Sequence, residues 1–457
     1  MAARSVQAGA PADRRLALLA GVSPGVVVLA AAIPLLFLHV SFQPGVTVSV
    51  GGSSATAYLS DFAVLAVVLA ALARLRAEAG ALRAGLPVWV AGAALFAWIA
   101  VEVVHGHARA SGYSLATHGI SAAKFFEYGL LAPALVLLVR RRVDLLAVLW
   151  SLTLWSCAAT VVGLLQFAGV AVADPAPSPG HRQASFLSSS DFAALSAGVL
   201  LVGIAAATLP RLGLGRRLAG VALATGVLGT IVAGSMASVI GVATALAVLA
   251  IVLAVRRELP PARLAAAGAV ALVVLGGTVA IRGSDLEAFG RFLGGSPPVR
   301  STRGRVESYA HRTLLSWMGL RMWRDHPVLG LGWEASADPA GFTPYLPALH
   351  ARFPAEPANA FPAAAPGRHY GVQDAWIEAL ADLGVVGFIL WTAAFATAAW
   401  TALRGVLRGR GPAPLLALLA LGLLLWLWTA QGFYAGIPLD ALTALVFGLA
   451  TLRTVEP

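Results

Sequence analysis

Three acidic side chains at the start of a long apolar run are the first candidates for chemistry. Asp374, Glu378 and Asp382 are spaced four residues apart, so a helix would place all three on one face. Charges inside a membrane span are costly and normally face the protein interior, where they pair. Asp374 lies nearest to the surface, and its carboxylate is the best candidate for a base. The alternative is a structural stripe of ion pairs, above all for Asp382.

Arginine side chains are natural partners for these acids and can also bind phosphate. The guanidinium group is a planar fork that contacts a phosphate at two points. The rule of positively charged cytoplasmic loops does not explain Arg182, Arg305, Arg312, Arg321 or Arg324. Such a group beside a membrane predicts a site for a diphosphate or an anionic lipid head group. For any single arginine the alternative is a solvated surface charge.

Other polar residues enter the apolar runs from the same side. They are Asp61, Lys124, Glu127, Asp191, Gln431 and Tyr434. Lys124 and Glu127 are three residues apart and can pair on a helix. Asp61 and Asp191 each follow a serine and partly resemble helix caps. A collection on one side predicts a site at the outer leaflet rather than a pore at the midplane.

Metal and cofactor sites are not predicted. All histidines except His39 fall at or near the outer surface, but His105 and His107 form the only close pair. That pair has no Cys, His or carboxylate partner at ligand spacing. The sequence lacks a phosphate-binding glycine loop, a dinucleotide-binding motif and a serine nucleophile motif. Cys157 is the only cysteine, so no disulfide can form within the chain.

Composition describes the elements that must position these residues. The chain is 59% hydrophobic and 12% charged, whereas soluble domains carry about 25% charged residues. Apolar runs alternate with short gaps, and every second gap carries a cluster of arginines. Loops rich in arginine stay in the cytoplasm, so both termini are predicted to be cytoplasmic. The net charge of +11 then reflects membrane insertion, and no nucleic-acid partner is expected.

The runs predict an all-α, polytopic membrane protein with about twelve spans of roughly 20 residues each. The spans are about 16–41, 57–76, 86–104, 118–139, 144–170, 188–209, 217–234, 236–255, 263–281, 373–403, 413–430 and 434–453. Residues 1–281 would hold nine helices, residues 282–372 one long extracytoplasmic loop, and residues 373–457 the last three helices. The first run is too long for a cleavable signal and is interpreted as a retained helix.

The loop 282–372 is too long for a linker, and loops of this length usually have a function. Its middle, about 301–326, is predicted to be a surface helix because apolar residues recur there at helical spacing. These residues are Ala310, Leu314, Trp317, Met318 and Met322. The helix would lie on the membrane or cap the bundle. Residues 338–366 are rich in Pro and Ala and are predicted to be irregular.

Four stretches carry a resemblance to a known family. They are HRQASFLSSSDFAALSAG (181–198), HRTLLSWMGLRMWRDHPVLGLGWEAS (311–336), QDAWIEALADLGVVGFILW (373–391) and YLSDFAVLAVVL (58–69). They resemble the O-antigen ligase and polymerase superfamily of bacterial membrane glycosyltransferases. The second and third stretches are the more specific, and the expected topology matches the family over nearly the whole chain.

The resemblance implies a multi-pass enzyme of the bacterial cytoplasmic membrane that takes a glycan from an undecaprenyl-diphosphate carrier. The acceptor is a glycolipid in ligases and another carrier-linked glycan in polymerases. The implied reaction is inverting and metal-independent. It takes place at the outer face of the cytoplasmic membrane, in contact with membrane lipids. The family's diphosphate-binding arginines fall on Arg182 and Arg312, and Arg305 is a further candidate.

Two positions depart from the family pattern. The family's His-Asn pair falls on Gln373 and Asp374, so the base would be Asp374 or His369. The family's arginine in the hairpin after the seventh span falls on Met236. Ligase and polymerase remain equal alternatives, beside a degenerate member that only binds glycan lipid. A transporter or flippase for a lipid-linked or anionic substrate is the alternative from another class, although transporters usually show repeated halves.

Overall fold

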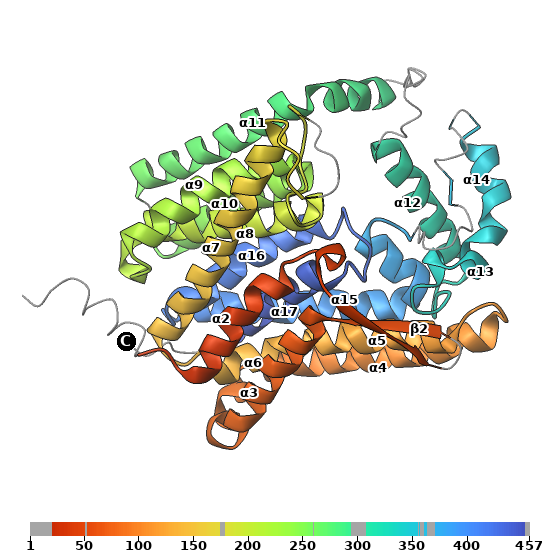
Figure 1. Ribbon diagram of the computed structural model, residues 1–457, viewed down its shortest axis with the longest axis horizontal. Helices are drawn as coiled ribbons and strands as arrows, with labels where there is room; N and C mark the ends of the chain where they lie inside the picture. The colour runs from red at the N-terminus through yellow and green to blue at the C-terminus, as the bar shows by residue number, and fades with distance from the viewer. Residues whose placement is uncertain are drawn as a thin grey trace, which may run out of the picture.

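Long helices formed by the apolar runs lie along the longest axis of the molecule (Figure 1). The computed structural model describes residues 21–50, 53–173, 179–258, 260–293, 308–354, 356, 361–362 and 371–452. The first helices are α2 (Pro24–Leu36), α3 (Leu59–Leu82), α4 (Leu86–Arg109), α5 (Leu115–Gly129), α6 (Leu131–Leu138), α7 (Arg142–Phe167), α8 (Ser189–Thr208) and α9 (Arg216–Ala233). The others are α10 (Met236–Val255), α11 (Pro261–Leu293), α12 (Ser308–Asp325), α13 (Pro339–Phe342), α14 (Leu346–Arg352), α15 (Ala375–Leu407), α16 (Pro412–Leu427) and α17 (Ile437–Thr451).

Within the described residues, eight stretches are long and apolar enough to cross a membrane, with α3 and α4 counted as one stretch and α5 and α6 as another. Three further apolar helices, α2, α16 and α17, are shorter. Large apolar side chains remain exposed on the outer surfaces of these helices, for example Leu72 (54%) and Leu272 (69%). Such a surface suits lipid and not water. The prediction of a helical membrane protein is confirmed, and the number of twelve spans stays a prediction.

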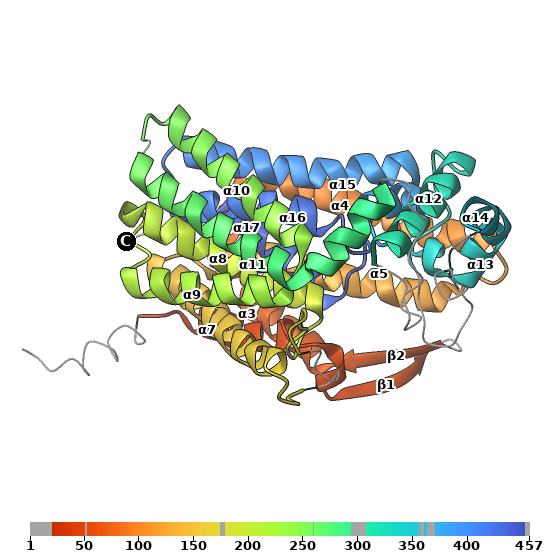
Figure 2. The ribbon, with the colours of Figure 1, turned by 90° about the horizontal axis from the view of Figure 1, so that it is seen from above.

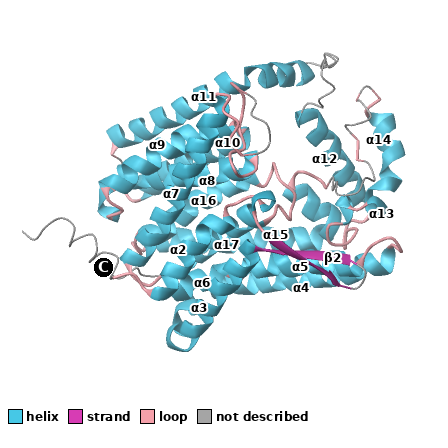
Figure 3. Cartoon of the chain, in the orientation of Figure 1, coloured by secondary structure: helices cyan, strands magenta, loops and turns pink. Residues whose placement is uncertain are grey.

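The described residues also contain one short pair of strands beside the helices. Strands β1 (Gly45–Val50) and β2 (Ser53–Tyr58) pair antiparallel and form a hairpin, drawn in magenta in Figure 3. Alternating Val and Thr residues favour strands because their branched side chains pack well on a pleated surface. The hydroxyls of Thr47 and Thr56 lie 2.9 Å apart across the hairpin.

Small residues allow the close approach of α8 and α9 at the centre of the bundle. A Cβ added at Gly226 on α9 would lie 2.5 Å from the Cα of Leu200 on α8. In the opposite direction, a Cβ at Gly203 would lie 2.6 Å from the backbone nitrogen of Leu223. Helices in membranes associate through such small residues, because lipid offers no hydrophobic driving force.

Helix α15 is broken at Gly384, where the backbone has φ 65° and ψ −170°. The ring of Trp376 lies 5.9 Å from that of Trp391 and 5.4 Å from that of Phe395. Fifteen residues of a continuous helix would separate the first pair by about 22 Å. The nine residues before Gly384 therefore fold back on the rest of α15, and the predicted span 373–403 is not one continuous helix.

The loop after α12 occupies the break in α15. Leu331 donates its backbone N–H to the Ala381 carbonyl at 2.9 Å, and Val385 donates to the Pro327 carbonyl at 2.9 Å. A Cβ at Gly384 would collide with the backbone of Val328. Only glycine fits here, because the site combines a positive φ with direct contact between two backbones.

Helices α12, α13 and α14 gather at the end of the molecule opposite to the C-terminus (Figures 1 and 2). Leu314, Leu315, Met318 and Met322 of α12 are buried in a small apolar cluster of their own. The predicted helix at 301–326 is therefore present as α12, although residues 301–307 lie outside the described residues. It packs on α15 and so caps the bundle. The prediction that 338–366 is irregular is wrong for α13 and α14.

Candidate active site

Three arginines from distant parts of the chain converge beside the turn between α9 and α10. Arg182 precedes α8, Arg282 lies within α11, and Arg312 lies on α12. A Cβ added at Gly234 in the turn would lie 2.9 Å from the Cβ of Arg182 and 3.5 Å from the Cδ of Arg282. Arg282 also donates a hydrogen bond from Nη1 to the Gly234 carbonyl at 3.1 Å. We call Arg182, Arg282 and Arg312 the arginine cluster.

Arg312 is held in a half-buried position. Its Nη2 donates to the carbonyl of Ala430, in the loop between α16 and α17, at 3.1 Å. Burial and the positive charges of Arg182 and Arg282 lower the pKa of Arg312, and Asp374 opposes this shift. Arginine still keeps its proton in proteins, so three like charges are held close together. An anion such as a diphosphate would relieve their repulsion and accept their hydrogen bonds.

Asp374 lies next to the arginine cluster at the N-terminus of α15. Its Oδ1 accepts the backbone N–H groups of Trp376 at 3.0 Å and Ile377 at 3.2 Å and so caps the helix. Burial raises the pKa of the Asp374 carboxyl, and the two N–H groups and Arg312 oppose this rise. The structure thus places Asp374 at the cap of α15, where it interacts with the charge of Arg312.

The other two acids of α15 do not pair with arginine, as the sequence had suggested they would. Buried Glu378 accepts the backbone N–H of Phe433. Buried Asp382 accepts the backbone N–H of Ser336 at 2.8 Å and the hydroxyl of the same residue at 3.0 Å. Loop backbone and a serine satisfy these carboxylates, because the break in α15 turns them toward the loops that pack on it.

Arg282 is the site residue that the sequence patterns missed. It follows the ninth predicted span on the outer side, where the positive-inside rule does not explain an arginine, and this signal could have revealed it. The backbone of α11 leaves helical geometry at Arg282, with φ −113° and ψ 18°. Met236 occupies the position of the family's hairpin arginine, and Arg282 reaches the same hairpin from another helix.

Lys124 forms its ion pair with Asp61 and not with Glu127. Its Nζ lies 2.8 Å from Oδ2 of Asp61 and donates to the Thr56 carbonyl, also at 2.8 Å. Asp61 accepts the backbone N–H of Tyr58 at 2.8 Å, in a capping box at the start of α3. The cap prediction for Asp61 is confirmed, and the group ties the β-hairpin to α3 and α5.

The remaining polar candidates also take part in local structure. Asp191 in the first turn of α8 accepts the hydroxyl of Ser188, the capping residue, at 2.6 Å. Tyr434 stacks parallel to Tyr128, with ring centres 6.4 Å apart. Gln431 lies in the same loop as Tyr434, between α16 and α17.

Two predicted residues, Arg305 and His369, lie outside the described residues. Arg321 lies over the ring of Trp317 at 5.9 Å. Exposed Arg324 has a long contact of 3.9 Å with Asp325. The interpretation as surface charge fits Arg324, and it makes this residue a natural control for the arginine cluster.

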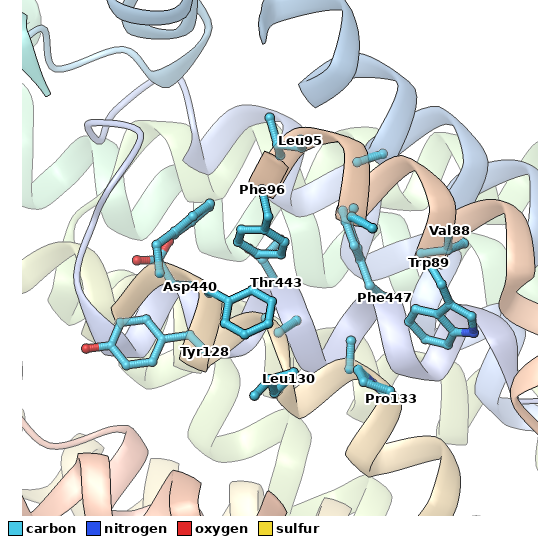
Figure 4. Close-up of a pocket in the computed structure, with 18 of the residues that line it drawn as sticks. Val88, Trp89, Leu95, Phe96, Tyr128, Leu130, Pro133, Asp440, Thr443 and Phe447 are labelled. Carbon is cyan, nitrogen blue, oxygen red and sulfur yellow. The ribbon is translucent and has the colours of Figure 1, made fainter. Parts of the chain in front are cut away.

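An apolar cavity of about 390 Å³ lies beside the site, between α4, α5, α6 and α17 (Figure 4). Its aromatic lining includes Trp89, Phe96 and Phe447, and its polar side chains include Asp440 and Thr443. Trp428 also lines it, and the Trp428 carbonyl accepts the backbone N–H of Ala375, next to Asp374, at 2.9 Å. Cavities of this size and lining hold apolar molecules or parts of them.

The described part of the chain contains no group of three or more His, Cys, Asp or Glu side chains that could hold a metal ion. Its candidate chemistry lies in the charges of the arginine cluster and in the acids around α15.

A comparison with protein families agrees with this geometry. Residues 219–392 match the family model described as O-antigen ligase. The matched range contains Arg282, Arg312 and Asp374 and extends past the break in α15. The match confirms the resemblance seen in the sequence and supports membership of this family. No curated protein matches the chain.

Proposed function

We propose that this membrane protein transfers a glycan from an undecaprenyl-diphosphate-linked donor to a glycan or glycolipid acceptor. The family match supports glycan transfer of the O-antigen ligase or polymerase type in general. The arginine cluster carries the finer proposal, because three guanidinium groups at one end of a membrane bundle suit a diphosphate whose lipid stays in the bilayer.

In this reaction an acceptor hydroxyl attacks the anomeric carbon, and the bond from that carbon to the diphosphate oxygen breaks. The diphosphate leaves with the bonding electrons, and the arginine cluster would stabilise the charge that develops on it. Attack from the opposite face inverts the anomeric configuration. The arginines supply the positive charge that a metal ion would otherwise bring. The hydroxyl proton passes to a base, for which the sequence predicts Asp374 or His369.

The reaction would take place at the outer face of the bacterial cytoplasmic membrane, with both termini in the cytoplasm. The position of α12–α14 at the end opposite to the C-terminus supports this orientation (Figure 1). Single cysteines at Asp285→Cys and Ala340→Cys, in a Cys157→Ala background, should react with an impermeant thiol reagent in intact cells. Labelling only after lysis would invert the topology.

Transfer by the purified protein in lipid vesicles tests the function directly. With an undecaprenyl-diphosphate-linked oligosaccharide and an acceptor glycan, we expect a longer glycan and released undecaprenyl diphosphate. Both products are needed, because a hydrolase would release the diphosphate without lengthening the acceptor. Movement of the donor across the bilayer without any covalent product would identify a flippase instead.

A further inference from the structure

A second polar site lies where the loop after α12 meets α4 and α5. The hydroxyl of Tyr113 donates to the Trp333 carbonyl at 2.7 Å, and the indole N–H of Trp333 donates to the Ser121 hydroxyl at 2.8 Å. A Cβ at Gly332 would lie 2.6 Å from the Cα of Gly106 on α4. These contacts fix the position of the next residue in the loop, Glu334.

Glu334 is the more exposed of the two acids beside His118, at 23% against 18% for Asp338. Its carboxylate accepts the hydroxyl of Ser121, and 23% of its side chain is exposed. Glu378 and Asp382, by contrast, are buried and have backbone partners. The backbone of Glu334 has φ 55°, a left-handed conformation that residues other than glycine rarely adopt. The fold thus presents a carboxylate at a position where glycine would be the easier choice.

His118 faces Glu334 with one buried and unsatisfied nitrogen. Its Nε2 lies 3.1 Å from Oδ2 of Asp338, and its ring stacks on Tyr113 with centres 3.8 Å apart. Its Nδ1 has no hydrogen-bond partner, and it lies 3.9 Å from Oε2 of Glu334, too far for a hydrogen bond. Only 7% of the side chain is exposed. A buried polar nitrogen without a partner is costly and indicates a ligand atom at this place.

The distance between the two side chains allows one hydroxyl group to bridge them. A hydroxyl oxygen could lie about 2.8 Å from both Nδ1 of His118 and Oε2 of Glu334. The angle Nδ1–oxygen–Oε2 would then be about 90°. It would donate its hydrogen to Glu334 and accept one from His118 when the imidazole is charged between its two carboxylates.

This place is connected to the arginine cluster by the segment of α15 that precedes Gly384. Glu334 interacts electrostatically with Glu378, and Glu378 interacts with Asp374. Asp374 in turn interacts with Arg312. Gly332 and Ser336, on either side of Glu334, donate backbone N–H groups to Asp382. Asp382 lies eight residues after Asp374, about 12 Å along a helix, so a donor diphosphate on the arginines and a hydroxyl at Glu334 would lie along the same short helix.

We propose that His118 and Glu334 bind the sugar hydroxyl of the acceptor, and that Glu334 accepts the proton of this hydroxyl. This inference rests on the proposed function. The O–H bond breaks as the oxygen forms its bond to the anomeric carbon, and the proton moves to the Glu334 carboxylate. The bond between that carbon and the diphosphate oxygen breaks, and its electron pair leaves with the diphosphate. Glu334 is thereby a rival to Asp374 and His369 as base.

The variant Glu334→Gly tests the proposal, because glycine accepts the positive φ and removes only the side chain. We expect kcat for transfer to fall by about 10²–10⁴-fold, the usual contribution of a base, with the KM for the donor unchanged. Formate should restore transfer at least about tenfold, because it can enter the vacated space and accept the proton. A merely structural carboxylate would not respond to formate.

Three companion variants sharpen the result. Glu334→Gln keeps the shape and should lose the same kcat without rescue by formate. His118→Asn should raise the acceptor KM about tenfold, the loss expected for one hydrogen bond. Glu78→Gln is the matched control, since Glu78 pairs with Arg140 away from the site and its side chain is similarly exposed, at 20%.

Each outcome decides a different point. Transfer at the wild-type rate by Glu334→Gly, or no rescue by formate, would overturn the role of Glu334. Loss of donor binding in Glu334→Gly would place this residue in the donor site or the fold instead. If the wild type itself forms no product while it binds the donor, the proposed function fails first.

Discussion

The arginine cluster lies near Asp374, and the loop that carries Glu334 contacts Asp382 on the same short segment of α15. The two sites are built in opposite ways. The arginine cluster holds three like charges together, and two of them, Arg282 and Arg312, donate hydrogen bonds to backbone carbonyls. The other site is a network of hydrogen bonds in which one buried nitrogen lacks a partner. The charge of the arginine cluster therefore suits any diphosphate. The fixed geometry of the site around His118 and Glu334 suits one particular hydroxyl.

A change that removes the break in α15 should have the largest effect, because it would move the two regions apart. In Gly384→Ala the new Cβ would meet the backbone of Val328, and we expect the fold to lose roughly 3 kcal/mol or more. Thermal unfolding in detergent measures the effect. Gly409→Ala is the matched control, since its φ is also positive at 68° but its Cβ would meet open space. Equal stability of the two variants would contradict the docking contact.

Changes in the arginine cluster should come next and should affect transfer only. Arg312→Lys keeps the charge but loses the two-point fork, and we expect kcat/KM to fall by about 10²-fold, as for other transition-state donors. Arg182→Lys and Arg282→Lys should behave similarly. Arg324→Lys, at the exposed surface, should keep its activity within about twofold. Full activity of Arg312→Lys would reduce that residue to a surface charge.

Asp374→Asn should have a smaller effect on transfer. The size of this effect tells which of the two regions supplies the base. Asparagine can cap α15 through its own Oδ1, so we expect transfer to fall less than about tenfold if Glu334 accepts the proton. The companion variant is His369→Ala. A loss above about 10²-fold in Asp374→Asn alone would make Asp374 the base. The same loss in His369→Ala alone would assign the role to His369.

The smallest effect concerns stability and pH. The raised pKa of Asp374 means that the folded protein binds this proton more tightly than the unfolded chain. The carboxyl therefore stabilises the fold at low pH, and this contribution is lost as the pH rises from the unfolded pKa of about 3.9 through the folded value. We expect the wild-type Tm to fall over this window relative to that of Asp374→Asn. Parallel curves would mean that Asp374 is equally acidic in both states.

Much of the candidate donor site could be predicted from the sequence, because single residues carry strong local signals. Arg182 and Arg312 stand in recognisable stretches, and both belong to the arginine cluster. Arg282 was missed because it reaches the hairpin only through a turn in α11, which periodicity does not reveal. Lys124 was paired with the wrong acid, since helical spacing brings Glu127 near but the folded β-hairpin brings Asp61 nearer.

The sequence by itself determined that the chain is a helical membrane protein, because apolar length and arginine placement are local properties that insertion into a bilayer reads directly. It also determined which family the chain resembles. Only the tertiary structure decided that α15 folds back at Gly384 and that His118 faces Glu334, more than 200 residues away along the chain. Such pairings depend on close packing between distant backbones, and no spacing along the chain encodes which distant segments will meet.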